Sequence, residues 1–197
     1  MDKISKNEVI RKIIHISFSI IPLSYLWFFN EKEKMLYIVA ILIFFAFVIE
    51  ILRTSPNKFS NLFNYFFGFM LRTNEANGNL TGATWLLIGC IITIIFYDMP
   101  IAVSSMLLLL IGDSIAAIAG KIYPIFKIGK KTLFGSFCGF FSSFIFILNF
   151  NHTLSPTVIF FGSIVGMLVE LVPTKINDNL TIPILSGFVM TLLDTAI

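Results

Sequence analysis

Long apolar runs separated by short polar segments constrain the fold of this chain more than any other feature. A membrane-spanning helix needs about 20 apolar residues, within a range of about 17–25, and seven segments approach that length. They are Ile13–Phe29, Met35–Leu52, Leu80–Tyr97, Pro100–Ala119, Leu133–Phe150, Pro156–Val172 and Leu180–Ile197. Only 13% of the 197 residues are charged, against about 25% in soluble domains. We therefore predict an all-α, polytopic membrane protein with about seven transmembrane helices in one domain, 1–197.

The segment Asn57–Leu71 differs from these runs because Asn, Ser and Lys interrupt its aromatic residues. Its apolar residues follow the i, i+3, i+4 spacing of a helix with one apolar face; they are Phe59, Leu62, Phe63, Phe66, Phe67 and Met70. This pattern predicts an amphipathic helix that lies in the membrane interface. A short or re-entrant eighth helix is the alternative.

The positions of the cations predict the orientation, since Lys and Arg favour the cytoplasmic side in short loops. With a cytoplasmic N-terminus, the outer loops hold only Lys32 and Lys34. The other twelve fall on the inner side: Lys3, Lys6, Arg11, Lys12, Arg53, Lys58, Arg72, Lys121, Lys127, Lys130, Lys131 and Lys175. We therefore expect a multi-pass protein of the cell membrane, and a net charge of +3 is too small to indicate binding to nucleic acid.

Three carboxylates, Glu50, Asp113 and Glu170, lie within or beside apolar runs on the predicted inner half. A carboxylate in a membrane span is costly unless it is paired or hydrated, so it usually marks a functional site. Each is followed within eight residues by an inner cation: Arg53, Lys121 and Lys175 respectively. An interfacial ion pair with Arg53 is an alternative explanation of Glu50.

Other helices place polar residues at the same depth. Arg11 and His15 are four residues apart on the first helix and can share a face; an interhelical hydrogen bond is the simpler explanation of His15. Together with the carboxylates they predict a cavity that faces the cytoplasm and is open to a water-soluble cosubstrate and to lipid.

The central motif is IGDSIAAIAGK, Ile111–Lys121. Its small residues recur at helical spacing and would let helices pack closely in lipid, but packing does not explain the Asp within them. A buried Asp113 is well suited to hold Mg²⁺ near phosphates, because this ion prefers one or two carboxylates together with phosphate oxygens.

Two further segments contain groups that suit phosphate. In KIGKKTLFGS, Lys127–Ser136, Lys130 and Lys131 offer positive charge and the glycines allow close backbone approach. We expect a flexible cationic loop, and a role limited to fixing topology is its alternative. In NDNLTIP, Asn177–Pro183, the polar residues at the start of the last helix suit either N-capping or an anionic ligand.

The order RKIIH, GDSIAAIAGK, GKKTLFGS, Glu170 and NDNLTIP resembles the dolichol kinase, phytol kinase and CTP-dependent diacylglycerol kinase family over nearly the whole chain. The GKKTLFGS segment is also similar to one in phosphatidate cytidylyltransferases, but the paired aspartates of that family's C-terminal signature are not found here.

The resemblance implies transfer of the γ-phosphoryl group of CTP, with Mg²⁺, to a polyprenol, another isoprenoid alcohol or diacylglycerol. Such chemistry needs positioned cations and a metal more than covalent catalysis. The implied catalytic residues are Asp113, Glu170 and His15, with Asp113 and Asp178 as metal ligands. The implied nucleotide and phosphate contacts are Arg11, Lys121, Lys130, Lys131, Thr132, Gly135, Ser136 and Asn179.

Two other functions remain open on sequence grounds. A cytidylyltransferase would use the same cavity but attack the α-phosphate of CTP. A small transporter would also use intramembrane carboxylates, although carriers usually place them near the midplane of the bilayer. Neither the acceptor alcohol nor the oligomeric state follows from the residues.

Overall fold

The computed structural model describes residues 5–173 and 176–196. Lys3, Lys175 and Ile197, which the sequence analysis names, lie outside the described residues. The helical elements in chain order are α1 Lys6–Ser17, α2 Ile20–Trp27, α3 Lys32–Thr54, α4 Lys58–Phe67, η1 Gly68–Met70, α5 Thr73–Ala76, α6 Gly82–Phe96, α7 Met99–Leu107, η2 Leu108–Asp113, α8 Ser114–Ile122, α9 Leu133–Phe150, α10 Pro156–Leu171 and α11 Asp178–Asp194.

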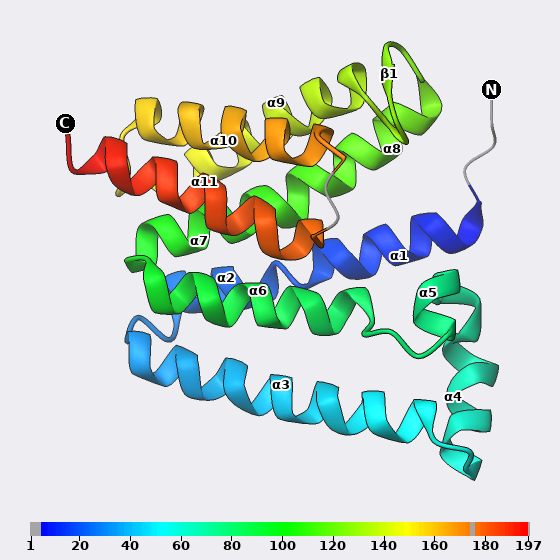
Figure 1. The fold of residues 1–197 in the computed structure, drawn as a ribbon. Coiled ribbons are helices and arrows are strands. Elements are labelled where there is room, and N and C mark those ends of the chain that lie inside the picture. Colours follow the sequence, from blue (N-terminus) through cyan, green and yellow to red (C-terminus); the bar gives the residue numbers. More distant parts are fainter. Residues whose placement is uncertain (1–4, 174–175, 197) are drawn as a thin grey trace.

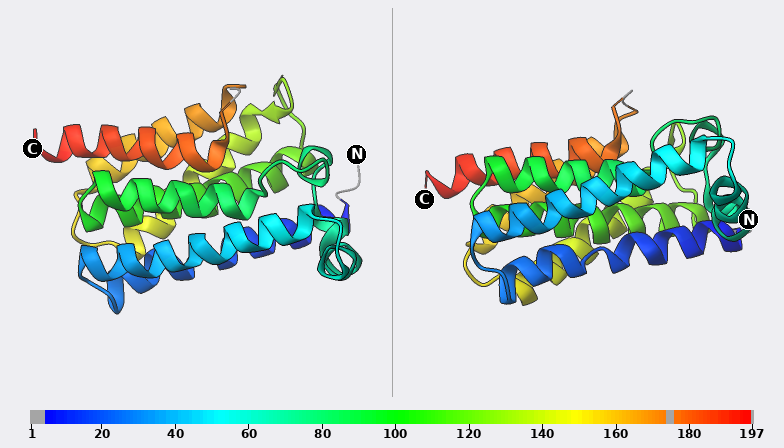
Figure 2. Two further views of the ribbon diagram at one scale, coloured as in Figure 1. Left: turned by 60° about the horizontal axis from the view of Figure 1, so that its bottom comes forward. Right: turned by 90° about the horizontal axis from the view of Figure 1, so that it is seen from below.

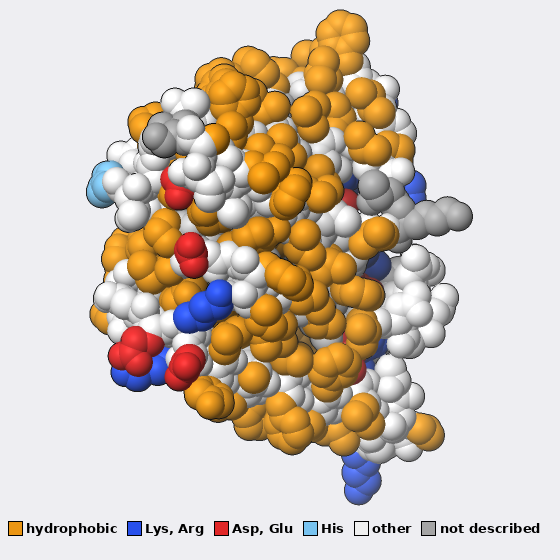
Figure 3. Space-filling model, turned by 60° about the vertical axis from the view of Figure 1, so that its left-hand side comes forward, with side chains coloured by type: hydrophobic (Ala, Val, Ile, Leu, Met, Phe, Trp, Pro, Cys, Tyr) orange, Lys and Arg blue, Asp and Glu red, His pale blue; other side chains and the backbone are white. Residues whose placement is uncertain are grey.

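Four of the helical rods are long and apolar enough to cross a membrane: Lys6–Trp27, Lys32–Thr54, Met99–Ile122 and Leu133–Phe150. Two shorter apolar helices accompany them, Gly82–Phe96 and Pro156–Leu171. Hydrophobic side chains form a broad band across the face shown in Figure 3, while acidic and basic groups lie toward both sides of that band. These features identify a multi-pass membrane protein, and the described part of every expected span is largely helical.

The helices run side by side, so that their ends form two opposite ends of a bundle (Figures 1 and 2). One end holds the start of α1, α4, α5 and the α8–α9 connection, and the connection from α10 to α11 starts on the same side. The end of α11 and the α2–α3, α6–α7 and α9–α10 connections lie at the other. The segments with predicted inner cations therefore gather at one end, which we call the polar end.

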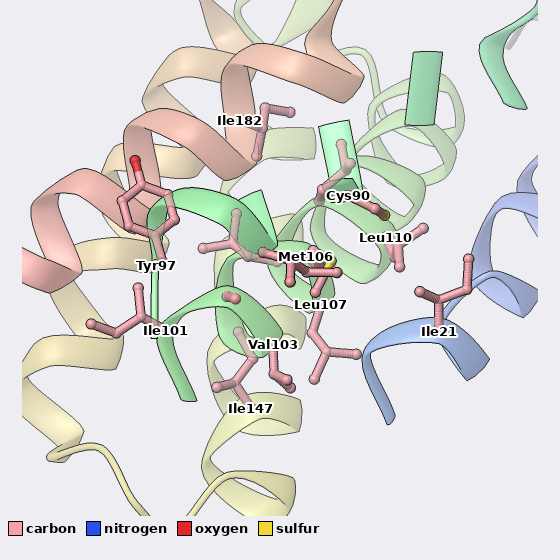
Figure 4. Packing of buried hydrophobic residues seen from close by; sticks show 14 of the residues in the cluster. Ile21, Cys90, Tyr97, Ile101, Val103, Met106, Leu107, Leu110, Ile147 and Ile182 are labelled. Carbon is pink, nitrogen blue, oxygen red and sulfur yellow. The ribbon is translucent and has the colours of Figure 1, made fainter. Parts of the chain in front are cut away.

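The rod α7–η2–α8 forms the centre of the bundle. Val103, Met106 and Leu107 are fully buried, and they point among residues of α2, α6, α9 and α11 in Figure 4. Because apolar side chains surround it, this rod is the best-shielded helix of the protein. Asp113 is the last residue of η2, and α8 continues the rod from there into the polar end of the bundle.

Close contact between α8 and α9 depends on glycine. A Cβ atom at Gly139 would lie 2.6 Å from the Gly112 carbonyl oxygen and 3.0 Å from the Ala116 Cβ. A Cβ atom at Gly135 would collide with the Ala116 carbonyl oxygen and the Thr132 hydroxyl. The small-residue stripe is therefore a packing surface, as its spacing predicts.

The first helix begins at Lys6, ahead of the apolar run Ile13–Phe29, so Arg11 and His15 both lie on it as expected, and the run is divided between α1 and α2. One local expectation needs correction. The cationic loop is partly ordered: β1 (Lys127–Ile128) pairs antiparallel with β2 (Lys131–Thr132), so the fold is all-α apart from this hairpin. The helix expected over Asn57–Leu71 is present as α4 and η1, with the Asn57 side chain accepting a hydrogen bond from the Ser60 amide at 2.8 Å.

Candidate active site

Asp113 lies where the central rod changes its hydrogen-bonding pattern. The six residues Leu108–Asp113 form a π-helix between two α-helices, a feature frequent at functional sites. The carboxylate of Asp113 accepts a hydrogen bond of 2.5 Å from the Lys12 ammonium of α1. Both side chains are largely buried, with 8% of Lys12 and 15% of Asp113 exposed. The pair joins α1 to the end of the π-helix.

His15 is the second residue of α1 beside Asp113. Its Nε2 atom is 3.9 Å from the carboxylate, is buried, and has no hydrogen-bond partner among the described residues. Contacts among the described residues leave this nitrogen unexplained, which supports a functional role for His15. The predicted catalytic residues Asp113 and His15 are brought together.

A second polar cluster joins the hairpin to α10 and α11. The Lys131 ammonium is 2.7 Å from Asp178 and 3.3 Å from Glu170, and it also donates to the Glu170 carbonyl. The Ser136 hydroxyl donates to the Glu170 carboxylate at 2.7 Å. Burial alone would lower the pKa of Lys131, but Glu170 and Asp178 together hold it above its ordinary value. Lys131 therefore remains a cation at neutral pH.

Glu50 belongs to a third, structural group. One of its oxygens accepts hydrogen bonds from Thr81 and Thr84 at 2.6–2.8 Å, and the other pairs with Arg53 at 2.5 Å. Arg53 in turn donates to the carbonyls of Glu75 and Asn79. The ion pair that offered an alternative explanation of Glu50 is therefore present within α3, and the hydrogen bonds from Thr81 and Thr84 fix α3 to the start of α6.

The remaining predicted site residues are spread over the polar end. Lys121 pairs with Glu8 and not with Asp113, while Lys130 is exposed in the turn of the hairpin. Asn179 donates to the Gly82 carbonyl at 2.8 Å. The cation that follows Asp113 in the sequence, Lys121, is thus not its partner. The nearer cation, Lys12, comes from a helix that is distant in sequence.

Thr132 and Gly135 have structural roles in addition to any contact with phosphate. The buried Thr132 hydroxyl caps α9 by accepting from the Gly135 amide at 3.0 Å. Gly135 itself is enclosed by α8. Packing therefore explains this glycine without a ligand.

A cavity of about 400 Å³ opens beside Asp113. Its lining includes Arg11, Lys12, His15, Asp113 and Asn179, together with residues of α3, α4 and η1. Arg72 and Glu75 also reach it. Its volume lies in the roughly 300–1,000 Å³ range of small-molecule sites, so it is large enough for a substrate.

Comparison with known proteins identifies relatives of this architecture. No family model matches the chain, and no solved structure is significantly similar to it. An uncharacterized protein of Rickettsia prowazekii is 31% identical over 88% of both chains. CTP-dependent diacylglycerol kinase 1 of Schizosaccharomyces pombe is 26% identical over 95% of this chain and 94% of its own length. The protein of the same name from Saccharomyces cerevisiae is 26% identical over 96% of this chain and 74% of its own.

The chain is a distant homologue of the CTP-dependent diacylglycerol kinase 1 family. The similarity extends over nearly the full length, so it includes both polar clusters and the cavity. The resemblance stated from the sequence motifs is thereby confirmed.

A magnesium ion in such a kinase homologue would need carboxylates close to the cations that suit phosphate. Within residues 5–173 and 176–196, no group of three or more His, Cys, Asp or Glu side chains could hold a metal by itself. Mg²⁺ commonly takes one or two carboxylates and completes its shell with substrate phosphates. Glu170 and Asp178, which already share one cation, fit that requirement. Asp113 and Asp178, the predicted ligand pair, contact different lysines.

Sequence reasoning did not single out Lys12, although it lies within the RKIIH motif. It counted only as one of the inner cations. The signal was its spacing, since Lys12 and His15 are three residues apart and share a helix face. Arg72 likewise counted only as an inner cation, and Glu75 carried no signal, because the position of α5 beside the cavity depends on tertiary structure.

Proposed function

We propose that this protein is a CTP-dependent lipid kinase of the inner, cytoplasmic leaflet. It transfers the γ-phosphoryl group of CTP to the hydroxyl of a lipid alcohol, either diacylglycerol or a polyprenol or other isoprenoid alcohol. Its diacylglycerol kinase homologues support the use of CTP and a lipid acceptor. The concentration of cations at the polar end supports the cytoplasmic orientation.

The position of Asp113 carries the proposal. Its side chain lines the cavity, is paired with Lys12, and interacts electrostatically with Lys131 of the second cluster. One carboxylate thus lines the cavity and is within electrostatic range of a cation suited to phosphate. Phosphoryl transfer needs this kind of arrangement, with an acceptor group and phosphate-binding charge held close together.

In the proposed reaction the alcohol oxygen attacks the γ-phosphorus, and the bond between that phosphorus and the β–γ bridging oxygen breaks. Asp113 accepts the proton of the alcohol, and CDP leaves. Lys12 and His15 hold the Asp113 carboxylate in place. His15 and Glu170 are the other candidate proton acceptors.

The second cluster would bind the nucleotide. Lys131 and the exposed Lys130 would contact the triphosphate, with Ser136, Thr132 and Asn179 nearby as hydrogen-bonding groups. Glu170 and Asp178 would hold Mg²⁺, which supplies charge neutralisation at the phosphates when bound. Arg11, which lines the cavity, and Lys121, which pairs with Glu8, would add positive charge at the polar end.

The position of a label distinguishes this reaction from its alternatives. The full chain is reconstituted in nanodiscs with a panel of lipid alcohols and given CTP labelled at either the α- or the γ-phosphate. We expect label in the lipid from the γ position alone. Label from the α position would instead identify a cytidylyltransferase, and no transfer from either position by folded protein would refute the kinase.

A further inference from the structure

The lining of the cavity beside Asp113 combines charged and apolar side chains. Its charged and polar residues include Lys12, His15, Glu50 and Asp113. Its apolar residues come mainly from α4, η1, α1 and α3: Phe59, Phe63, Phe67, Met70, Leu71, Ile14, Phe18, Ala46 and Ile49. A single cavity thus combines a charged cluster with a hydrocarbon-like lining. The ligand that matches both is amphipathic.

Helix α4 provides the most distinctive part of this lining. Phe59, Phe63 and Phe67 are spaced four residues apart, and successive rings lie 6.2 and 5.3 Å from centroid to centroid. All three line the cavity. We call them the α4 aromatic ladder. The ladder forms a continuous apolar strip along one side of the helix.

Core packing does not explain α4. None of its residues is buried, and its exposed large side chains include Leu62, Tyr65 and Phe66 as well as Phe59 and Phe67 of the ladder. An exposed aromatic face is suited to the membrane interface. The ladder differs from the other face because it lines the cavity, so an apolar ligand in that space would bury it further.

The second cluster lies elsewhere. Lys131, Glu170 and Asp178 do not line the cavity that the described residues form. Asp113 reaches the cavity and also interacts with Lys131 and Glu170. The two substrates of a transfer reaction can therefore approach this carboxylate from different sides.

We propose that the cavity is the acceptor site, with the hydrocarbon chain of the lipid alcohol along the α4 aromatic ladder and its hydroxyl beside Asp113. This inference rests on the proposed kinase function and assigns the substrate side of that reaction. Helix α4 is then a wall of the substrate site as well as a membrane-interface helix.

Photo-crosslinking tests this assignment without requiring turnover. The full chain in nanodiscs is exposed to a diacylglycerol, and separately to an isoprenoid alcohol, each carrying a diazirine in its hydrocarbon chain. Labelled peptides are mapped by mass spectrometry with an excess of the same unlabelled alcohol, of a phospholipid with matching chains, or of CTP. We expect the alcohol to suppress labelling of Phe63 and Phe67, while labelling of the outward Phe66 persists.

Three outcomes would overturn the proposal: ladder labelling suppressed by CTP and not by alcohol, suppressed equally by phospholipid, or suppressed by no competitor. The first would indicate a nucleotide cavity, the second a general lipid groove, and the third an adventitious surface. Alcohol-suppressed labelling without phosphoryl transfer would support the acceptor site and refute the kinase function. Phosphoryl transfer without alcohol-suppressed labelling would support the kinase function and refute the acceptor site.

Kinetics of matched variants add a second measurement. Phe63→Ala removes the central ring of the ladder, and Phe66→Ala removes a ring of the outward face. We expect Phe63→Ala to raise the KM for lipid alcohol roughly ten-fold, as loss of one aromatic contact would, with the KM for CTP unchanged. Phe66→Ala should leave both constants unchanged. An increase in the KM for CTP alone would contradict the assignment.

Discussion

Replacing Lys12 by Met tests whether the ion pair with Asp113 is a buried element of the site. The two side chains are 8% and 15% exposed and are joined by a hydrogen bond of 2.5 Å. Removing one partner of a buried pair costs about 3–5 kcal/mol, because the other charge is left uncompensated. In a protein of this size that loss lowers the melting temperature by about 6–20 °C.

Thermal unfolding in detergent measures this effect, and Lys121→Met is the matched control. The Lys121 side chain is 47% exposed, so loss of its pair with Glu8 should cost within about 1 kcal/mol. The double variant Lys12→Met/Asp113→Asn removes both charges and should recover much of the stability lost by Lys12→Met. Equal stability of the Lys12→Met and Lys121→Met variants, or additive losses in the double variant, would refute the reasoning.

Two further predictions concern the second cluster and the helix packing. The pKa of Lys131 is raised in the folded protein. The stability that its pairs with Glu170 and Asp178 contribute is therefore complete at pH values below its ordinary pKa, and it is lost only as the pH rises through the higher pKa of the folded state. Denaturation should therefore show that Lys131→Met lowers the free energy of unfolding by a constant amount between about pH 6 and about pH 9. Disappearance of this difference from the wild type within that range would contradict the prediction. Gly139→Val should lower stability by about 1–3 kcal/mol, because its side chain would overlap with the Gly112 carbonyl. In the control Gly68→Ala the added Cβ would have no neighbouring atom nearer than 3.7 Å, so stability should change by at most about 1 kcal/mol. Equal effects of the two substitutions in melting curves would refute this explanation.

The helical rods could be predicted from sequence because hydropathy alone determines which segments suit lipid. Local geometry was less accessible. The π-helix over Leu108–Asp113 has no counterpart in the apolar pattern, since it depends on how the central rod packs. The hairpin at Lys127–Thr132 was also missed, because its two paired residues on each strand give no alternating pattern.

The candidate site was predicted in outline and not in its pairings. Asp113 and His15 were correctly expected to lie together, since both interrupt apolar runs at the same depth. Arg53 does pair with Glu50, but the partners of Asp113 and Glu170 described in the structure, Lys12 and Lys131, come from distant segments that only the folded bundle brings close. Gly135 lies in the GKKTLFGS motif, where its sequence position alone could not show whether it packs against α8 or approaches a phosphate.

Turnover of Asp113→Asn with γ-labelled CTP tests the central claim most directly. The substitution keeps the shape of the side chain and an oxygen that can accept from Lys12, but it removes the proton acceptor. We predict that transfer of label to the lipid alcohol falls by about 10²–10⁴-fold in protein that remains inserted and folded. Near-normal turnover of that variant would contradict the proposed role of Asp113 and the placement of the reaction at this carboxylate.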